Sequence, residues 1–93
     1  MIHFVVHREG DDVGTVVVEG VKAGETLAGW IMEEDKDVSI VARTEIPIGH
    51  KIALRDFRSG DTVIKYGVDI GKVVQPIRKG EHAHVHNIKT KRW

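Results

Sequence analysis

The chain of 93 residues contains no cysteine. This absence excludes disulfide bonds, iron–sulfur ligation by this chain and a thiol nucleophile, and it removes any need for an oxidising compartment. The sequence also lacks anything near the ~20 consecutive apolar residues that a transmembrane helix requires. Its N-terminal apolar run spans only Phe4–Val6, which is too short for the hydrophobic region of a signal peptide. We therefore expect a cytoplasmic protein.

The chain also has no net charge at neutral pH, since its lysines and arginines, 14 in all, balance 14 aspartates and glutamates. The balance conceals a strong asymmetry along the chain. Residues 1–49 carry ten acidic and four basic residues, a net charge of −6, and residues 50–93 carry the reverse, +6, with four of the six histidines. A region of one sign attracts the opposite charge, so the second half is expected to bind anions.

No helix is strongly indicated. The segment Glu25–Glu34 is the one candidate, but Gly29 at its centre and its β-branched neighbours favour a strand or irregular structure, and a short helical turn is expected at Arg55–Arg58. Short runs rich in Val and Ile alternate with Gly, Asp and Pro turns, which is typical of an all-β domain. The predicted strands cover residues 3–7, 13–19, 26–32, 38–44, 51–56, 62–66, 71–77 and 81–88. We expect one small domain, residues 1–93, with one modest core.

A four-residue pattern recurs along the chain, with glycine third and an acidic residue fourth. It occupies residues 22–25, 58–61 and 78–81. Glycine in this place suits a tight turn, because it accepts a positive φ at no steric cost. We interpret the recurrence as turn chemistry.

The densest chemistry lies near the C-terminus, where His82, His84 and His86 alternate just before Asn87. In an extended strand these histidines share one face, and Ala83 and Val85 pack into the core from the other. Adjacent members lie about 6–7 Å apart and the outer pair about 13 Å, so two of them can reach one metal ion but three cannot readily do so. From the residues alone, a site and a merely structural role are equally open.

Three motifs together resemble the SAF domain of the altronate and galactarate dehydratase family. They are IPIGHK at residues 46–51, VIKYGVDIG at 63–71 and GEHAHVHN at 80–87. The resemblance implies a β-clip-like fold and an elimination reaction on a 2-hydroxy acid. It also implies an iron cofactor, Fe²⁺, held mainly by a separate large catalytic subunit.

The short chain ending KTKRW is most similar to the free-standing small subunits of this family. Those subunits act with a large subunit to release sulfite from (2R)-3-sulfolactate, leaving pyruvate. Two alternatives remain: a small subunit or N-terminal module of an altronate or galactarate dehydratase, and a non-catalytic SAF module that binds its ligand without reaction. In either enzyme, this chain is expected to be inert without its large subunit.

The same resemblance assigns roles to individual side chains, and it leaves the metal ligands unassigned. His84 and His86 are the expected catalytic residues. The expected substrate-binding residues are His50, Lys51, Lys65, Asn87 and Lys89.

His3 and His7 receive no role. The basic C-terminal segment with Trp93 is expected to dock on the partner, because its three cations, in a chain of zero net charge, are too few for the basic surface typical of a nucleic-acid-binding protein. No membrane contact is expected.

Overall fold

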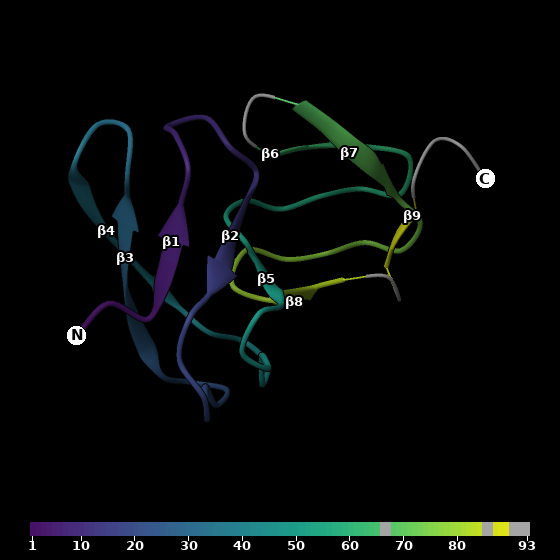
Figure 1. Ribbon diagram of the computed structural model, residues 1–93. Helices are drawn as coiled ribbons and strands as arrows, with labels where there is room; N and C mark the ends of the chain where they lie inside the picture. The colour runs from purple at the N-terminus through teal and green to yellow at the C-terminus, as the bar shows by residue number, and fades with distance from the viewer. Residues whose placement is uncertain (66–67, 85–86, 90–93) are drawn as a thin grey trace.

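The computed structural model describes residues 1–65, 68–84 and 87–89. These residues form nine short strands, arranged in two sheets and connected by turns (Figure 1). The strands are β1 (Phe4–Val6), β2 (Val13–Val16), β3 (Thr26–Ile31), β4 (Lys36–Val41), β5 (Lys51–Ala53), β6 (Thr62–Lys65), β7 (Val68–Val73), β8 (His82–Ala83) and β9 (Ile88–Lys89). No helix occurs among these residues, and accordingly none that is long and apolar enough to cross a membrane. The prediction of an all-β domain is confirmed.

The larger sheet has the strand order β4-β3-β1-β2-β5-β8, and the smaller one the order β6-β7-β9. All pairings are antiparallel except that of β1 with β3. The two faces of the larger sheet bury different cores. Phe4, Val16 and Ile52 belong to one core, whereas Val13 and Ala53 join residues of the smaller sheet in the other. Alternation along β5 thus places the adjacent side chains of Ile52 and Ala53 in separate cores.

The segment considered for a helix is strand β3. Leu27 and Ile31 point inward and are buried, while Thr26 is exposed, which is the period of two expected of a strand. Gly29 lies between them because a Cβ at this position would overlap the fully buried ring of Phe4. The glycine that weakens a helix therefore makes room for the largest side chain of the core.

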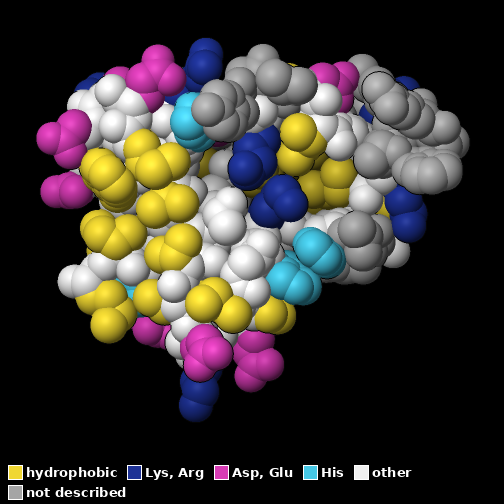
Figure 2. Space-filling view, in the orientation of Figure 1, with side chains coloured by type: hydrophobic (Ala, Val, Ile, Leu, Met, Phe, Trp, Pro, Cys, Tyr) yellow, Lys and Arg dark blue, Asp and Glu magenta, His cyan; other side chains and the backbone are white. Residues whose placement is uncertain are grey.

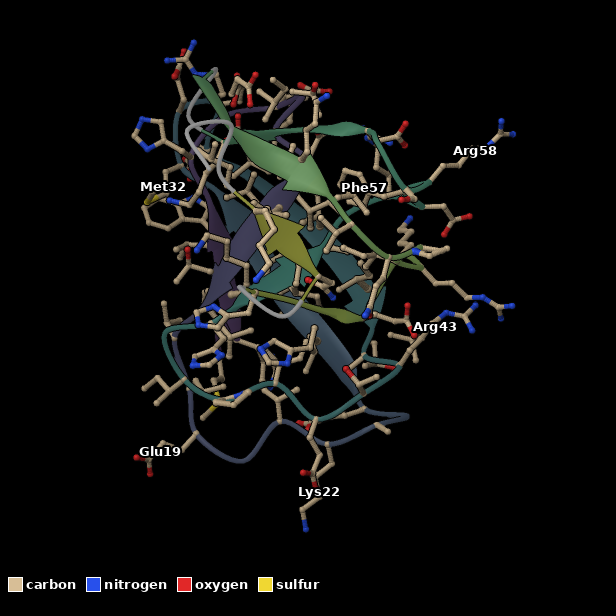
Figure 3. The ribbon with its side chains drawn as sticks, turned by 90° about the vertical axis from the view of Figure 1, so that its right-hand side faces the viewer. Glu19, Lys22, Met32, Arg43, Phe57 and Arg58 are labelled. Carbon is tan, nitrogen blue, oxygen red and sulfur yellow. The ribbon has the colours of Figure 1, made fainter. Side chains whose placement is uncertain are left out.

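The helical turn expected at Arg55–Arg58 is wrong. Phe57 instead forms an isolated antiparallel bridge with Ile77, and the Arg55 guanidinium lies 4.0 Å from the centre of the Phe57 ring. Arg55 Nε also donates to Asp12 Oδ1 at 2.8 Å, and this bond raises the pKa of Arg55. Figure 3 shows Phe57 turned toward the sheets and the neighbouring Arg58 extending away from them. Tertiary contacts thus hold this segment extended.

Five turns of one design connect the strands, including the three that the recurring pattern predicted. In each, the N–H of the fourth residue donates to the carbonyl of the first, and the third residue is a glycine with φ between 84° and 94°. This positive φ explains the glycine, since other residues are strained there. The turns are Arg8–Asp11, Lys22–Glu25, Pro47–His50, Arg58–Asp61 and Arg78–Glu81.

Candidate functional site: a histidine cluster

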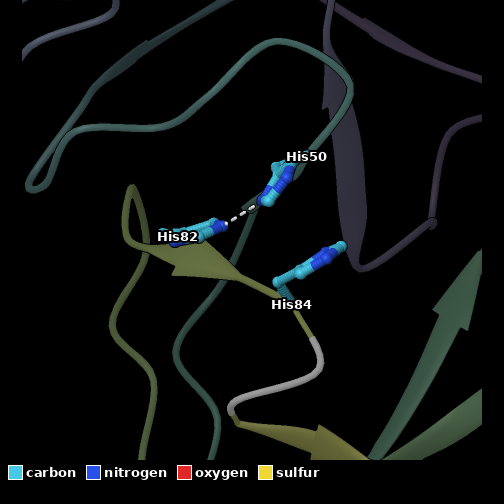
Figure 4. Close-up of side chains that lie close together, drawn as sticks. All are labelled: His50, His82 and His84. Carbon is cyan, nitrogen blue, oxygen red and sulfur yellow. Dashed lines mark hydrogen bonds between the residues drawn. The ribbon is translucent and has the colours of Figure 1, made fainter.

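The imidazoles of His50, His82 and His84 lie together at the edge of the larger sheet (Figure 4). One ring nitrogen from each lies within 4.8 Å of the others. His50 Nδ1 and His82 Nε2 share a hydrogen bond of 2.8 Å, and the rings of His50 and His84 stack with centroids 3.9 Å apart. All three side chains are half-buried. Among the described residues, this is the group of three side chains suited to holding a metal ion.

The antiparallel pairing of β5 with β8 brings these histidines together. Lys51 lies opposite Ala83, and Ile52 lies opposite His82. His50 immediately precedes β5 and His84 immediately follows β8, so the register places these two residues beside each other. The segments are about thirty residues apart in the sequence, and spacing within 81–88 could not reveal the third histidine.

A change in the recurring turn frees the side chain of His50. In the other four turns the fourth residue is acidic, and its carboxylate accepts a hydrogen bond from the N–H of the first residue. Pro47 begins the turn that contains His50, and proline has no N–H to donate. No acceptor is needed at the fourth position, and a histidine stands there whose ring contacts His82 and His84 instead.

Asn87 shapes the turn that follows β8. Its Oδ1 accepts from the N–H of His84 at 2.9 Å, its Nδ2 donates to the carbonyl of His82 at 2.8 Å, and its side chain is almost fully buried. The N–H groups of Asn87 and Ile88 both donate to the carbonyl of His84. The chain therefore leaves the sheet after Ala83, and the uninterrupted strand predicted at 81–88 is wrong. Local hydrogen bonds from an asparagine side chain compete here with the strand ladder.

The predicted alternation of faces is confirmed where the structure describes it. Ala83 is fully buried in the core beneath the smaller sheet, whereas His82 points to the opposite side of β8. Val85 and the predicted catalytic residue His86 lie outside the described residues, as do Tyr66 and residues 90–93. The histidine side of β8 is therefore defined by His82 alone, with His84 in the turn beyond it.

The three lysines predicted to bind substrate are distributed over both sheets. Lys51 follows His50 directly and is half-buried on β5. Lys65 ends β6 opposite Val68, and Lys89 is exposed on β9 opposite Lys72. Figure 2 shows Lys and Arg side chains close to histidines on one face, with hydrophobic side chains gathered to one side. Lys51 thus adjoins the cluster along the chain, while Lys65 and Lys89 belong to the smaller sheet.

An open pocket of about 270 Å³ adjoins the cluster, lined in part by Thr44, Glu45, Glu81, His82 and Asn87. Thr44 Oγ1 accepts from the N–H of His82 at 3.0 Å. Ligand sites usually occupy about 300–1,000 Å³ and enclose most of the ligand. An open pocket of this size encloses only one side of a small ligand.

The small all-β fold in two sheets is consistent with that of a SAF domain. The family model of the altronate/galactarate dehydratase SAF domain matches residues 2–91, and the chain belongs to this family.

The chain matches two relatives over nearly the whole length of those proteins. The chain is 61% identical over 92 residues to the (2R)-sulfolactate sulfo-lyase subunit alpha of Chromohalobacter salexigens, covering 99% of this chain and 98% of that protein. It is 51% identical over 63 residues to the subunit of the same name from Paracoccus pantotrophus, covering 68% of this chain and 94% of that protein.

A third relative is much longer. The chain is 38% identical over 90 residues to the altronate dehydratase of Bacillus subtilis, covering 97% of this chain but 17% of the dehydratase. The resemblance drawn from the three motifs is confirmed.

Proposed function

We propose that this chain is the small subunit of a carbon–sulfur lyase that releases sulfite from (2R)-3-sulfolactate and leaves pyruvate. The observation that carries the proposal is the 61% identity to a protein named as subunit alpha of such an enzyme, over 98% of that protein's length. A separate large subunit completes the active site, because the pocket beside His82 is open on this chain. A chain without cysteine has no need of an oxidising compartment, so the proposal places the complex in the cytoplasm.

The reaction is an elimination across two carbon atoms. A base removes the proton on C2, beside the carboxylate, as the bond from C3 to sulfur breaks and its electron pair leaves with sulfite. The resulting enol takes up a proton at C3, loses the proton of its hydroxyl group and becomes pyruvate. Such a step needs a positioned base and cations that stabilise the developing negative charge.

This chain supplies imidazole and ammonium groups for those tasks. We assign proton transfer to His84 and His86. The anionic groups of the substrate are assigned to His50, Lys51, Lys65, Asn87 and Lys89. Asn87 also has a positioning role, since its amide holds the backbone of His82 and His84.

The iron ion belongs mainly to the large subunit in this proposal. The described residues fit iron in part: imidazole is a suitable ligand and the cluster offers three, but the chain has no thiolate. When bound, Fe²⁺ would polarise the carboxylate and hydroxyl of the substrate. The bond from its N–H to Thr44 Oγ1 holds the backbone of His82 beside the open pocket.

Sugar-acid dehydration is the second candidate, favoured by the 38% identity to altronate dehydratase over 97% of this chain. The test is to copurify the chain with its native partner and to assay sulfite release from sulfolactate beside dehydration of altronate and galactarate. Sulfite release by the complex is expected. Dehydration without sulfite release would move the chain to the second candidate, and neither activity in a stable complex would leave only a binding module.

A further inference from the structure

We propose that His50, His82 and His84 bind one divalent first-row transition metal ion on this chain alone. The proposal goes beyond the lyase function and does not depend on it, because its ligands all come from the small subunit. Strand spacing excluded three ligands from residues 82–86. The pairing of β5 with β8 supplies the third ligand from a different part of the chain.

The hydrogen bonding within the cluster favours metal binding. His50 Nδ1 and His82 Nε2 lie 2.8 Å apart, so one of these nitrogens is unprotonated and accepts with its lone pair, and a metal ion would take this lone pair in place of the hydrogen bond. Neutral imidazole nitrogen is a suitable ligand for Zn²⁺, Fe²⁺, Co²⁺ and Ni²⁺. Three protein ligands with one further position open is the arrangement of catalytic zinc sites. The half-buried cluster leaves that position accessible to a partner residue or an anion.

The ring nitrogens of the three histidines can converge on one metal ion by side-chain rotation alone. Around a tetrahedral ion with metal–nitrogen bonds of about 2.0–2.1 Å, ligand nitrogens lie about 3.4 Å apart. The nitrogens now lie within 4.8 Å, and the stacked rings of His50 and His84 must turn to converge. Such turns leave the backbone in place.

Backbone hydrogen bonds hold all three ligand positions. The N–H of His50 donates to the carbonyl of Pro47 at 3.1 Å, and that of His82 to Thr44 Oγ1 at 3.0 Å. Asn87 holds the N–H of His84 at 2.9 Å. Because these bonds persist when the rings rotate, little backbone ordering is needed on binding. With His84 as a ligand, proton transfer in the proposed lyase falls to His86.

The test uses the full chain, stripped of metal with a chelator and titrated with Zn²⁺ and with Co²⁺. Calorimetry is expected to give one ion per chain, and Co²⁺ to show the visible absorption of a low-coordinate site. His50→Gln and His84→Gln should each weaken binding by about 100-fold or more, beyond the 10–100-fold typical of outer-shell partners. His7→Gln, outside the cluster, is the matched control and should bind as the unaltered chain does. At a metal concentration about 100 times Kd, the melting temperature should rise by about 10 °C or more.

A second measurement avoids the risk that a variant misfolds. In the unaltered chain labelled with [¹⁵N]histidine, Zn²⁺ should shift the imidazole signals of the three cluster residues and leave those of His3 and His7 in place. Absence of saturable binding, equal affinity in the cluster variants, or shifts confined to other histidines would overturn the proposal. Sulfite release by the complex is measured separately, so loss of the metal site and loss of the lyase function are distinguishable.

Discussion

At the scale of the residue, one substitution in a repeated turn accounts for a member of the site. Four turns use an acidic fourth residue to accept the N–H of their first residue, and the fifth begins with Pro47 and ends with His50. Proline removes the donor, and the side chain at the fourth position becomes available for contacts outside its turn. The imidazole of His50 then meets His82 by a hydrogen bond and His84 by stacking.

We predict that His86→Gln lowers kcat of the assembled complex by about 10²–10⁴-fold, the range expected when a proton-transferring group is lost. Glutamine keeps much of the polar shape, so the melting temperature and the association with the partner should stay unchanged. Steady-state kinetics and thermal melting of the complex check this, with His7→Gln as the control. Normal turnover together with a lowered melting temperature would make His86 a structural residue.

At the scale of the element, the short strand β8 is defined as much by the turn after it as by its pairing with β5. Asn87 bonds both the carbonyl of His82 and the N–H of His84, two groups that an uninterrupted strand would have offered to a neighbour. This turn ends the strand and returns the chain to β9, which pairs with β7 in the smaller sheet. The histidine positions and the path of the chain from β8 to β9 therefore depend on one buried amide.

We predict that Asn87→Ala destabilises the chain by about 1–3 kcal/mol, because it leaves two backbone groups without their partner. For a domain of this size, each kcal/mol corresponds to about 4–8 °C in melting temperature. Asn87→Asp should be milder, since it retains the acceptor for the N–H of His84. Thermal melting of both variants checks the order, and Gln75→Ala, at an exposed position, serves as the control. Equal stability of all three would show that the amide does not hold the turn.

At the scale of the whole molecule, the charge asymmetry of the sequence becomes a separation in space. Residues 1–49, with net charge −6, form the strands β4, β3, β1 and β2, which lie side by side in Figure 1. Residues 50–93, with net charge +6, contribute β5, β8 and the whole smaller sheet. The histidine cluster belongs to this basic half of the chain, whose positive charge would attract the anionic substrate proposed above.

We predict that the purified chain alone folds as a β-rich domain and releases no sulfite, because the pocket beside His82 is open and the partner's groups are missing. Circular dichroism and a sulfite assay of the chain, before and after addition of the large subunit, check this. Turnover by the isolated chain would contradict a shared active site.

Local physical chemistry in the sequence determined much of this protein. Glycines that accept a positive φ set the turns, and alternation of apolar residues set the strands, including β3, where Gly29 argued against a helix. The same alternation correctly separated Ala83 from His82. These features depend on neighbours within a few residues, so they can be read from the sequence directly.

Only the tertiary structure decided what depends on distant partners. Arg55 and Phe57 are extended rather than helical because Asp12 and Ile77 hold them. The strand predicted at 81–88 ends where the buried side-chain amide of Asn87 bonds the backbone of His82 and His84. These local hydrogen bonds compete with those between strands, and which of them form depends on burial. The histidine cluster exists because β5 and β8, about thirty residues apart, pair in one register. A pairing register is set by the packing of both faces of the sheet, and that packing exists only once the chain has folded.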